Sequence, residues 1–453
     1  MTVHRLVAGT SGPSGSYWRW EGKTVTDFEF VGDTPGDVID LDSLEPGFSA
    51  DPHPLYAALR RVTPVRRVRV RGLSAWLVTG YDAVRQALPH PGLSSDIRSA
   101  SPAVATHPFV RSEAVIGMDR HMLRSDPPDH SRLRRLVAKA FTVRRIEALR
   151  PRARQIATEL LAEVLPAGRA DLIEDFALPL PAIVIMELLG LPTADRRQFV
   201  GWIEATVAPG PEQAAQALAG FVNIRDYLAA QVARRSQEPV QDDLEGRDLL
   251  GALLAARDEG DRLSQDELVS MVFLLFSAGH VTTVDLIANG ALALLRNPDQ
   301  LAALRADRAL LGPAIEEFLR YDGPIECVIM RFTREEDVTI GGTTIPGGGE
   351  PVLVSVASTG RDPARFADPE AFDILRAPSS HLGFGHGIHY CLGAPLARME
   401  AHVAFTALLD HCDRLALAVD PAALTWRRSL YLRGPATLPV TFTAVPPPLS
   451  PTP

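Results

Sequence analysis

The stretch from Ser264 to Asn297 constrains the fold more than any other, because it is long, apolar and nearly free of charge. Ser264, followed three residues later by Glu267, predicts a capping box at a helix start, and Asn297-Pro298 predicts the helix end. At about 1.5 Å per residue, such a helix is about 50 Å long. Because it is apolar almost all round, it must be buried. The sequence therefore predicts a domain built around one long internal helix.

The middle of this helix carries residues that weaken it. Ala278-Gly279-His280-Val281-Thr282-Thr283 places a glycine and two threonines inside an otherwise apolar segment. The glycine lowers helix stability, and the hydroxyls can be offered to water or to a ligand. The alternative is that both hydroxyls bond to carbonyls of their own helical turn.

A second feature is the glycine-rich segment 384–393, FGHGIHYCLG, which ends around Cys391. A helix start follows directly at Gly393–Glu400, with Pro395 in the first turn. This order predicts that the Cys391 sulfur lies beside the free amides of the helix, where a thiolate is stabilised. Such a loop suits a soft, electron-donating anion held against an iron centre.

Two other interpretations of Cys391 remain open on the residues alone. A lone cysteine is often a small core hydrophobe. The cluster of His381, His386, His389 and Cys391 could instead be half of a zinc site, although a structural zinc site needs a second ligand pair at a defined spacing.

The complete string Phe-Gly-x-Gly-x-His-x-Cys-x-Gly resembles the heme-binding loop of the cytochrome P-450 family. The resemblance implies a mainly α fold with small β-sheets (α+β), the cytochrome P-450 fold. Heme b would lie between the long central helix and the cysteine loop. Cys391 would be the axial metal ligand, a thiolate that donates electron density to the iron.

Further strings resemble the family in the same order along the chain. Residues 126–135 resemble its propionate-binding helix, with His130 and Arg134 four residues apart on one face; a solvated basic face is the alternative. With Arg331 and His389, these groups would neutralise two heme propionates. The full set of cofactor contacts implied by the resemblance is His130, Arg134, Ala278, Gly279, Arg331, Phe384, Gly385, His389 and Gly393.

The middle of the long helix resembles the oxygen-activating segment of the family but departs from it at Val281, where an acid is usual. The resemblance assigns oxygen protonation to Thr282, beside Thr283. His280 or Asp285, one turn further on, could take the place of the missing acid.

The activity implied is that of an oxidoreductase, a monooxygenase that hydroxylates or epoxidises a small organic substrate in secondary-metabolite biosynthesis. The departure at Val281 leaves oxidative C–C, C–N or C–O coupling without oxygen insertion as an alternative. A second alternative is a non-enzymatic heme-binding sensor or scaffold.

The resemblance also implies a structural triad and a set of pocket-lining residues. Glu317, Arg320 and Arg376 match the triad. Residues expected to line the substrate pocket, besides a long loop at 91–120, are Phe276, Ser277, Ile325, Cys327, Val328, Leu430 and Tyr431.

We expect an N-terminal extension of unknown role at 1–50, a single catalytic domain at 51–443 and a proline-rich, disordered tail at 444–453. The net charge of −9 argues against nonspecific binding to nucleic acid or to an anionic membrane. Three cysteines in 453 residues make no disulfide framework, and no export signal or run of 18 apolar residues occurs, so we expect a cytoplasmic protein.

No flavin or iron–sulfur segment is evident, so we expect ferredoxin and ferredoxin reductase as separate electron donors. A basic surface at Arg132, Arg135, Lys139, Arg144 and Arg145 suits an acidic partner. The substrate could arrive free or tethered to a carrier protein. We expect the enzyme to be a monomer.

Overall fold

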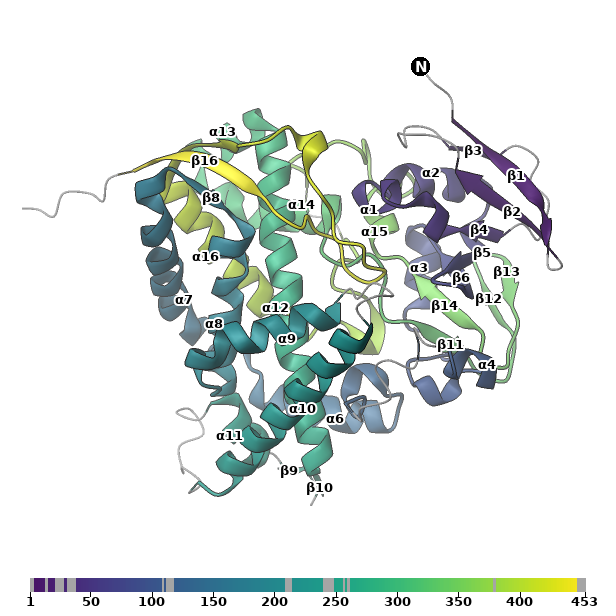
Figure 1. Ribbon diagram of the computed structural model, residues 1–453, viewed down its shortest axis with the longest axis horizontal. Helices are drawn as coiled ribbons and strands as arrows, with labels where there is room; N and C mark the ends of the chain where they lie inside the picture. The colour runs from purple at the N-terminus through teal and green to yellow at the C-terminus, as the bar shows by residue number, and fades with distance from the viewer. Residues whose placement is uncertain are drawn as a thin grey trace, which may run out of the picture.

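The computed structural model describes residues 4–12, 15–20, 28–30, 38–107, 110, 118–207, 214–238, 248–255, 257–258, 261–377 and 380–445. Its central element is α12 (Gln265–Arg296), which runs through the middle of the molecule (Figure 1). The Ser264 side chain accepts a hydrogen bond from the Glu267 amide, and the Glu267 side chain accepts one from the Ser264 amide. The predicted capping box, helix length and helix end at Asn297 are therefore confirmed.

Helices surround α12 on the side away from the large sheet, where α8, α10, α14 and α16 all contact it (Figure 1). By length and composition α12 could cross a membrane, but 72% of its most apolar window is buried inside the protein, as in a core helix. The other described helices are α1 Gly47–Ala50, α2 His53–Val62, α3 Tyr81–Ala87, α4 Pro102–Ala105, α6 Asp129–Ala140, α7 Val143–Val164, α8 Pro179–Leu189, α9 Arg196–Val207, α10 Ala214–Ser236, α11 Leu249–Ala255, α13 Pro298–Ala306, α14 Leu311–Asp322, α15 Ala357–Gly360 and α16 Ala394–His411.

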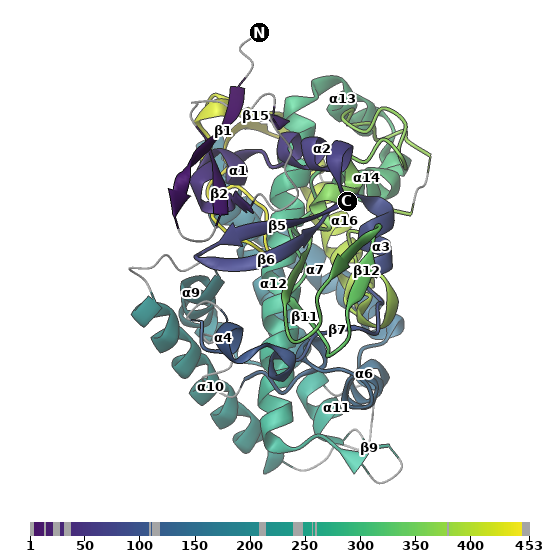
Figure 2. The ribbon, with the colours of Figure 1, turned by 90° about the vertical axis from the view of Figure 1, so that its right-hand side faces the viewer.

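The largest sheet lies beside this helical part and has the strand order β3-β1-β2-β4-β5-β6-β14-β11-β7 (Figures 1 and 2). Its middle is the antiparallel hairpin β5–β6, with Val65 opposite Val78, and β14 pairs with β6 in parallel. Its strands are β1 His4–Gly12, β2 Gly15–Trp20, β3 Phe28–Phe30, β4 Val38–Asp40, β5 Val65–Val70, β6 Leu73–Val78, β7 Leu93–Ser94, β11 Arg331–Thr333 and β14 Pro351–Val354.

Three small sheets complete the described strands. They are β9 (Arg257–Asp258) with β10 (Asp261–Arg262), β12 (Val338–Ile340) with β13 (Thr343–Ile345), and the order β15-β16-β8 formed by Cys412–Leu417, Pro439–Ala444 and Arg169–Asp171. The architecture is mainly helical with small sheets, as the sequence predicts.

The packed domain begins before Asp51, where we expected its boundary. Strand β4 pairs in parallel with β5, and Ile39, Leu41, Leu44 and Phe48 are buried in the hydrophobic core beside the sheet. Residues 38–50 thus belong to the domain, because their apolar side chains supply part of its core. At the other end β16 includes Ala444, and the expected tail after Val445 lies outside the described residues.

Candidate active site

Cys391 lies between a short helical turn, η9 (Gly387–His389), and the start of α16. Its amide donates to the Phe384 carbonyl at 2.9 Å, which closes the loop. Burial raises the pKa of the Cys391 thiol, while the amides of Gly393 and Ala394 lower it. The predicted placement of the sulfur beside the first amides of the following helix is what the structure shows.

A set of charged contacts braces this loop from behind. Arg398 of α16 donates to both carboxylate oxygens of Glu316 of α14, at 2.6 and 2.8 Å, and its guanidinium lies 4.5 Å from the Phe384 ring. His381 contacts the same carboxylate at 3.0 Å. His381 is therefore paired with Glu316. The described residues hold no group of three or more His, Cys, Asp or Glu side chains placed to bind a metal. The zinc interpretation has no ligand set there.

Four basic side chains converge beside the cysteine loop. His130 from α6 is 2% exposed, and both of its ring nitrogens are buried without a hydrogen-bond partner among the residues that the structure describes. The His389 ring lies 4.4 Å from the His130 ring, and Arg331, the first residue of β11, is 4% exposed. Arg134, one turn after His130, donates to the Tyr390 carbonyl at 2.7 Å.

Within the described part of the chain, no carboxylate is hydrogen-bonded to any of these four groups. Burial, with nearby Arg331 and His130 adding to its effect, lowers the pKa of His389 to about 2. Burial also lowers the pKa of Arg331 to about 10 and that of His130. Arg134 and Arg331 thus lower the pKa of both histidines, and such a cluster of basic groups is a receptor for anions, because a bound carboxylate would favour their charged forms.

The side chains in this part of the structure fit a heme group. The orphaned nitrogens of His130, the buried guanidinium of Arg331, Arg134 and His389 fit a ligand with two carboxylates. Cys391 supplies the thiolate that iron requires. Sequence reasoning missed one further member: Ser95, fully buried, has its hydroxyl 3.1 Å from Nε2 of His389. No spacing in the sequence links Ser95 to His389.

On α12, both threonine hydroxyls bond to their own turn. Thr282 Oγ1 donates to the Ala278 carbonyl at 2.6 Å, and Thr283 Oγ1 donates to the Gly279 carbonyl at 2.9 Å. This is the alternative that the sequence left open. Such bonds weaken the helical ladder at this point and leave each hydroxyl oxygen able to accept a hydrogen bond.

The two groups considered as substitutes for the missing acid at Val281 are engaged elsewhere. His280 Nε2 lies 3.2 Å from the Leu178 carbonyl, its ring contacts Phe276, and burial lowers its pKa to about 4. Asp285 is ion-paired with Arg427. The expectation that either group supplies a proton beside Thr282 is therefore not supported, because tertiary contacts direct both away.

A buried acid that sequence reasoning missed lies on α16. Glu400 is 1% exposed, and neither of its carboxylate oxygens has a hydrogen-bond partner in the described part of the chain. Burial raises its pKa well above the usual value, and the nearby Thr283 hydroxyl offsets only part of the shift. A signal was present, since Leu396 and Val403 lie four residues before and three after it on the same apolar helix face.

The predicted triad forms. Arg320 donates to both oxygens of Glu317 at 2.7 Å, and Arg376 lies 3.3 Å from the same carboxylate. Arg320 also donates to three backbone carbonyls, of Gly360, Pro369 and Ala371. Gly360 lies against the triad, because a Cβ at this position would be 1.8 Å from the Arg320 carbonyl oxygen.

The expected substrate-lining residues lie in two parts of the fold. Ile325 and Val328 adjoin the turn that carries Leu430 and Tyr431, since the Glu326 amide donates to the Tyr431 carbonyl at 3.0 Å. These segments lie between the sheet and α12. Cys327 is buried in the core cluster beside the sheet.

Phe276 and Ser277 make contacts within the helical part, and their place in the pocket stays a prediction. Phe276 is completely buried and packs edge-on against Phe199 of α9 with ring centroids 4.5 Å apart. Ser277 donates to the Phe273 carbonyl at 2.8 Å. The segment 91–120 contains β7, a helical turn at Ile97–Ser99 and α4, and its residues 108–109 and 111–117 lie outside the described residues.

Comparison with known proteins agrees with this fold and site. The family model described as Cytochrome P450 matches residues 193–421. Cytochrome P450 monooxygenase PikC of Streptomyces venezuelae is 48% identical over 408 residues, covering 89% of this chain and 94% of that protein. The 6-deoxyerythronolide B hydroxylase of Saccharopolyspora erythraea is 44% identical over 412 residues, covering 89% and 98%.

Among solved structures, the tirandamycin C-bound P450 monooxygenase TamI superposes with a TM-score of 0.80 at 45% identity, covering 89% of this chain and 99% of that one. The chain belongs to the cytochrome P450 family. It is a heme-thiolate oxidoreductase of the monooxygenase type, with small-molecule substrates and separate redox partners. When bound, the heme supplies the iron at which dioxygen is activated.

Proposed function

We propose that this enzyme hydroxylates or epoxidises a polyketide-type natural product. The observation that carries the proposal is the similarity over nearly the whole chain to a hydroxylase of a polyketide and to a monooxygenase solved with a natural product bound. The chain's own residues supply a thiolate at Cys391, four basic groups for the propionates, and a hydroxyl pair at Thr282 and Thr283.

The first test is the absorption spectrum of the reduced protein with carbon monoxide. The strongly red-shifted Soret band of a thiolate ligand is expected in the wild type and lost in Cys391→Ala. Cys412→Ala is the matched control, because Cys412 is equally a free cysteine but lies at the end of α16. Polyketide substrates can then be screened on the same sample by their spin-state shift; a library that produces no shift and no product would contradict the proposed substrate class.

Oxidative coupling is a second candidate function, favoured by Val281, which is 6% exposed and carries no acid to the oxygen site. Turnover under isotopically labelled dioxygen separates the two reactions, since a hydroxylated product gains a labelled atom and a coupled product does not. If the enzyme couples because its relay is interrupted, Val281→Glu should convert coupling into oxygen insertion.

We also propose that electrons arrive from a ferredoxin, which docks on basic residues of α6 and α7 beside the cysteine loop. Arg135, Lys139 and Arg144 are exposed there, and Ile388 and Tyr390 add exposed apolar surface. Charge reversal at Arg135 should slow reduction by ferredoxin and flatten its dependence on salt. Arg225→Glu on α10 is the control, and equal slowing in both variants would contradict this docking site. Turnover with peroxide, in an enzyme that turns over no substrate with any ferredoxin and reductase pair, would contradict the ferredoxin assignment.

The remaining proposals concern location and assembly. Three free cysteines support a cytoplasmic enzyme, and we propose that it acts as a monomer. Comparing free with carrier-tethered forms of the same substrate, by spin-state shift, tests how the substrate is presented.

A further inference from the structure

One face of α12, beyond the oxygen site, holds the C-terminal segment of the chain. Val281, Asp285 and Asn289 recur every fourth residue and so share this face. The Asp285 carboxylate is fully buried and accepts a hydrogen bond from Arg427. Asn289 donates to the Arg433 carbonyl at 2.9 Å. We name residues 427–434 the 427–434 turn. Side chains on a single face of α12 are thus hydrogen-bonded to both ends of this turn.

The 427–434 turn is closed by its own backbone. The Arg427 amide donates to the Gly434 carbonyl at 3.1 Å, and Ser429 Oγ accepts from the Tyr431 and Leu432 amides at 3.3 and 3.2 Å. Gly434 lies so close to the helix that a Cβ would be 2.1 Å from an Asp285 carboxylate oxygen. Backbone contact with α12 is therefore part of the geometry of the turn.

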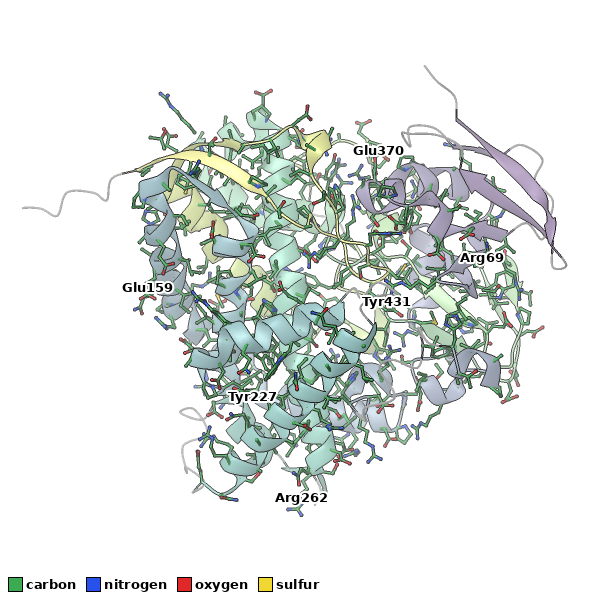
Figure 3. The ribbon with its side chains drawn as sticks, viewed as in Figure 1. Arg69, Glu159, Tyr227, Arg262, Glu370 and Tyr431 are labelled. Carbon is green, nitrogen blue, oxygen red and sulfur yellow. The ribbon has the colours of Figure 1, made fainter. Side chains whose placement is uncertain are left out.

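The tip of the turn carries Leu430 and Tyr431, both expected to line the substrate pocket. Figure 3 shows Tyr431 near the centre of the molecule, where the C-terminal segment passes between the helical part and the large sheet. The turn also contacts the segment that follows α14, because Leu432 forms an antiparallel β-bridge with Ile325. The position of this tip therefore depends on the hydrogen bonds that hold the base of the turn against α12.

The charge compensation of Asp285 rests on Arg427. Asp285 Oδ2 is buried and has no hydrogen-bond partner among the described residues, whereas Oδ1 is bonded to Arg427. The Arg427 side chain is only 23% exposed. A buried ion pair with one partner removed leaves an uncompensated charge, which forces the surrounding structure to rearrange.

We propose that Asp285 and Arg427 are a positioning pair that sets the shape of the distal pocket through the 427–434 turn. Neither residue touches the reacting atoms in this role. The pair decides how far Leu430 and Tyr431 reach into the pocket, and hence which bulky ligands fit. The inference rests on the same pocket as the proposed function but not on the identity of the substrate.

Two azole ligands test the proposal on the ferric holoenzyme. Imidazole is small and needs only the iron, whereas clotrimazole coordinates the iron through the same ring type and fills the pocket above it. The variants are Arg427→Met and Asp285→Asn, the second of which preserves the shape of the side chain. Arg428→Met is the matched control, because Arg428 is the next residue but has a 67% exposed side chain that pairs with Glu45 at 3.8 Å.

In both pair variants the ratio of the clotrimazole Kd to the imidazole Kd should change about tenfold, the size expected when one pocket contact is misplaced. The control should keep the wild-type ratio, and the double variant should shift no further than either single one. A wild-type ratio in Asp285→Asn and Arg427→Met, even with lowered thermal stability, would show a purely structural pair and overturn the proposal. Failure of the wild type to bind imidazole at all would instead contradict the heme assignment.

Discussion

Replacing Glu400 with glutamine should stabilise the enzyme at neutral pH. Glu400 is fully buried on α16, and neither carboxylate oxygen has a hydrogen-bond partner among the described residues. Burial raises its pKa well above the ordinary 4.5, because it favours the neutral acid over the carboxylate in the folded protein. Glutamine has nearly the same shape as the protonated acid and needs no proton.

The magnitude follows from linkage. In the unfolded chain Glu400 ionises near pH 4.5, and in the folded protein only at a much higher pH. Above pH 4.5 the folded state therefore binds a proton that the unfolded state releases, which costs the folded state about 1.4 kcal/mol per pH unit. The cost is absent below pH 4.5, grows by about that amount for each pH unit above it, and stops growing at the raised pKa of the folded state. Glu400→Gln should recover most of this free-energy cost at pH 7 and none of it at pH 4.

The assay is the free energy of unfolding of the holoenzyme by guanidinium chloride, followed by tryptophan fluorescence from pH 4 to pH 8. Glu316→Gln is the control with the opposite sign. Glu316 is also partly buried, but hydrogen bonds from Arg398 and His381 outweigh its burial and hold its pKa at about 2. Its stabilisation is present above the unfolded pKa of 4.5 and is lost as pH falls toward 2, so this variant should lose stability at pH 7. Equal pH slopes in Glu400→Gln and the wild type would refute the reasoning.

Three further predictions follow from the packing. Arg320→Met leaves the Glu317 carboxylate buried without its partner and should cost about 3–5 kcal/mol in the free energy of unfolding. Arg331→Gln removes one charge from the anion receptor and should speed heme loss about tenfold or more, measured by transfer to apomyoglobin; unchanged loss would mean that Arg331 holds no propionate. Gly360→Asn should lower stability by about 1–3 kcal/mol because its Cβ has no room; a neutral effect in thermal unfolding would show that the backbone there can shift.

Local sequence was sufficient wherever the structure depends on neighbours along the chain. The capping box at Ser264 and Glu267 involves residues three apart, and the amides that face Cys391 come from the helix that starts directly after it. The hairpin of β5 and β6 depends on neighbours in the same way, because its strands are joined by a short turn. Such features are fixed by backbone geometry over a few residues.

Sequence was insufficient where a distant partner decides the role of a side chain. Periodicity places Asp285 one turn after Val281, but Arg427, which pairs with it, lies 142 residues away in the chain. His280 is likewise fixed by the Leu178 carbonyl, 102 residues earlier. The domain boundary at Asp51 was wrong for a related reason, since Ile39 belongs to the core only through the pairing of β4 with β5.

The titratable groups around α12 differ in which form burial and pairing favour. Val281 carries no acid, Asp285 is ion-paired with Arg427, and His280 is neutral because burial lowers its pKa to about 4. Glu400, beside Thr283, is the acid whose protonated form is favoured, because burial raises its pKa. An isolated buried acid destabilises the fold, and a group retained at such a cost is a candidate for function. We therefore expect Glu400→Gln to gain stability and to lose product formed per electron consumed, because both effects follow from removing the same buried proton.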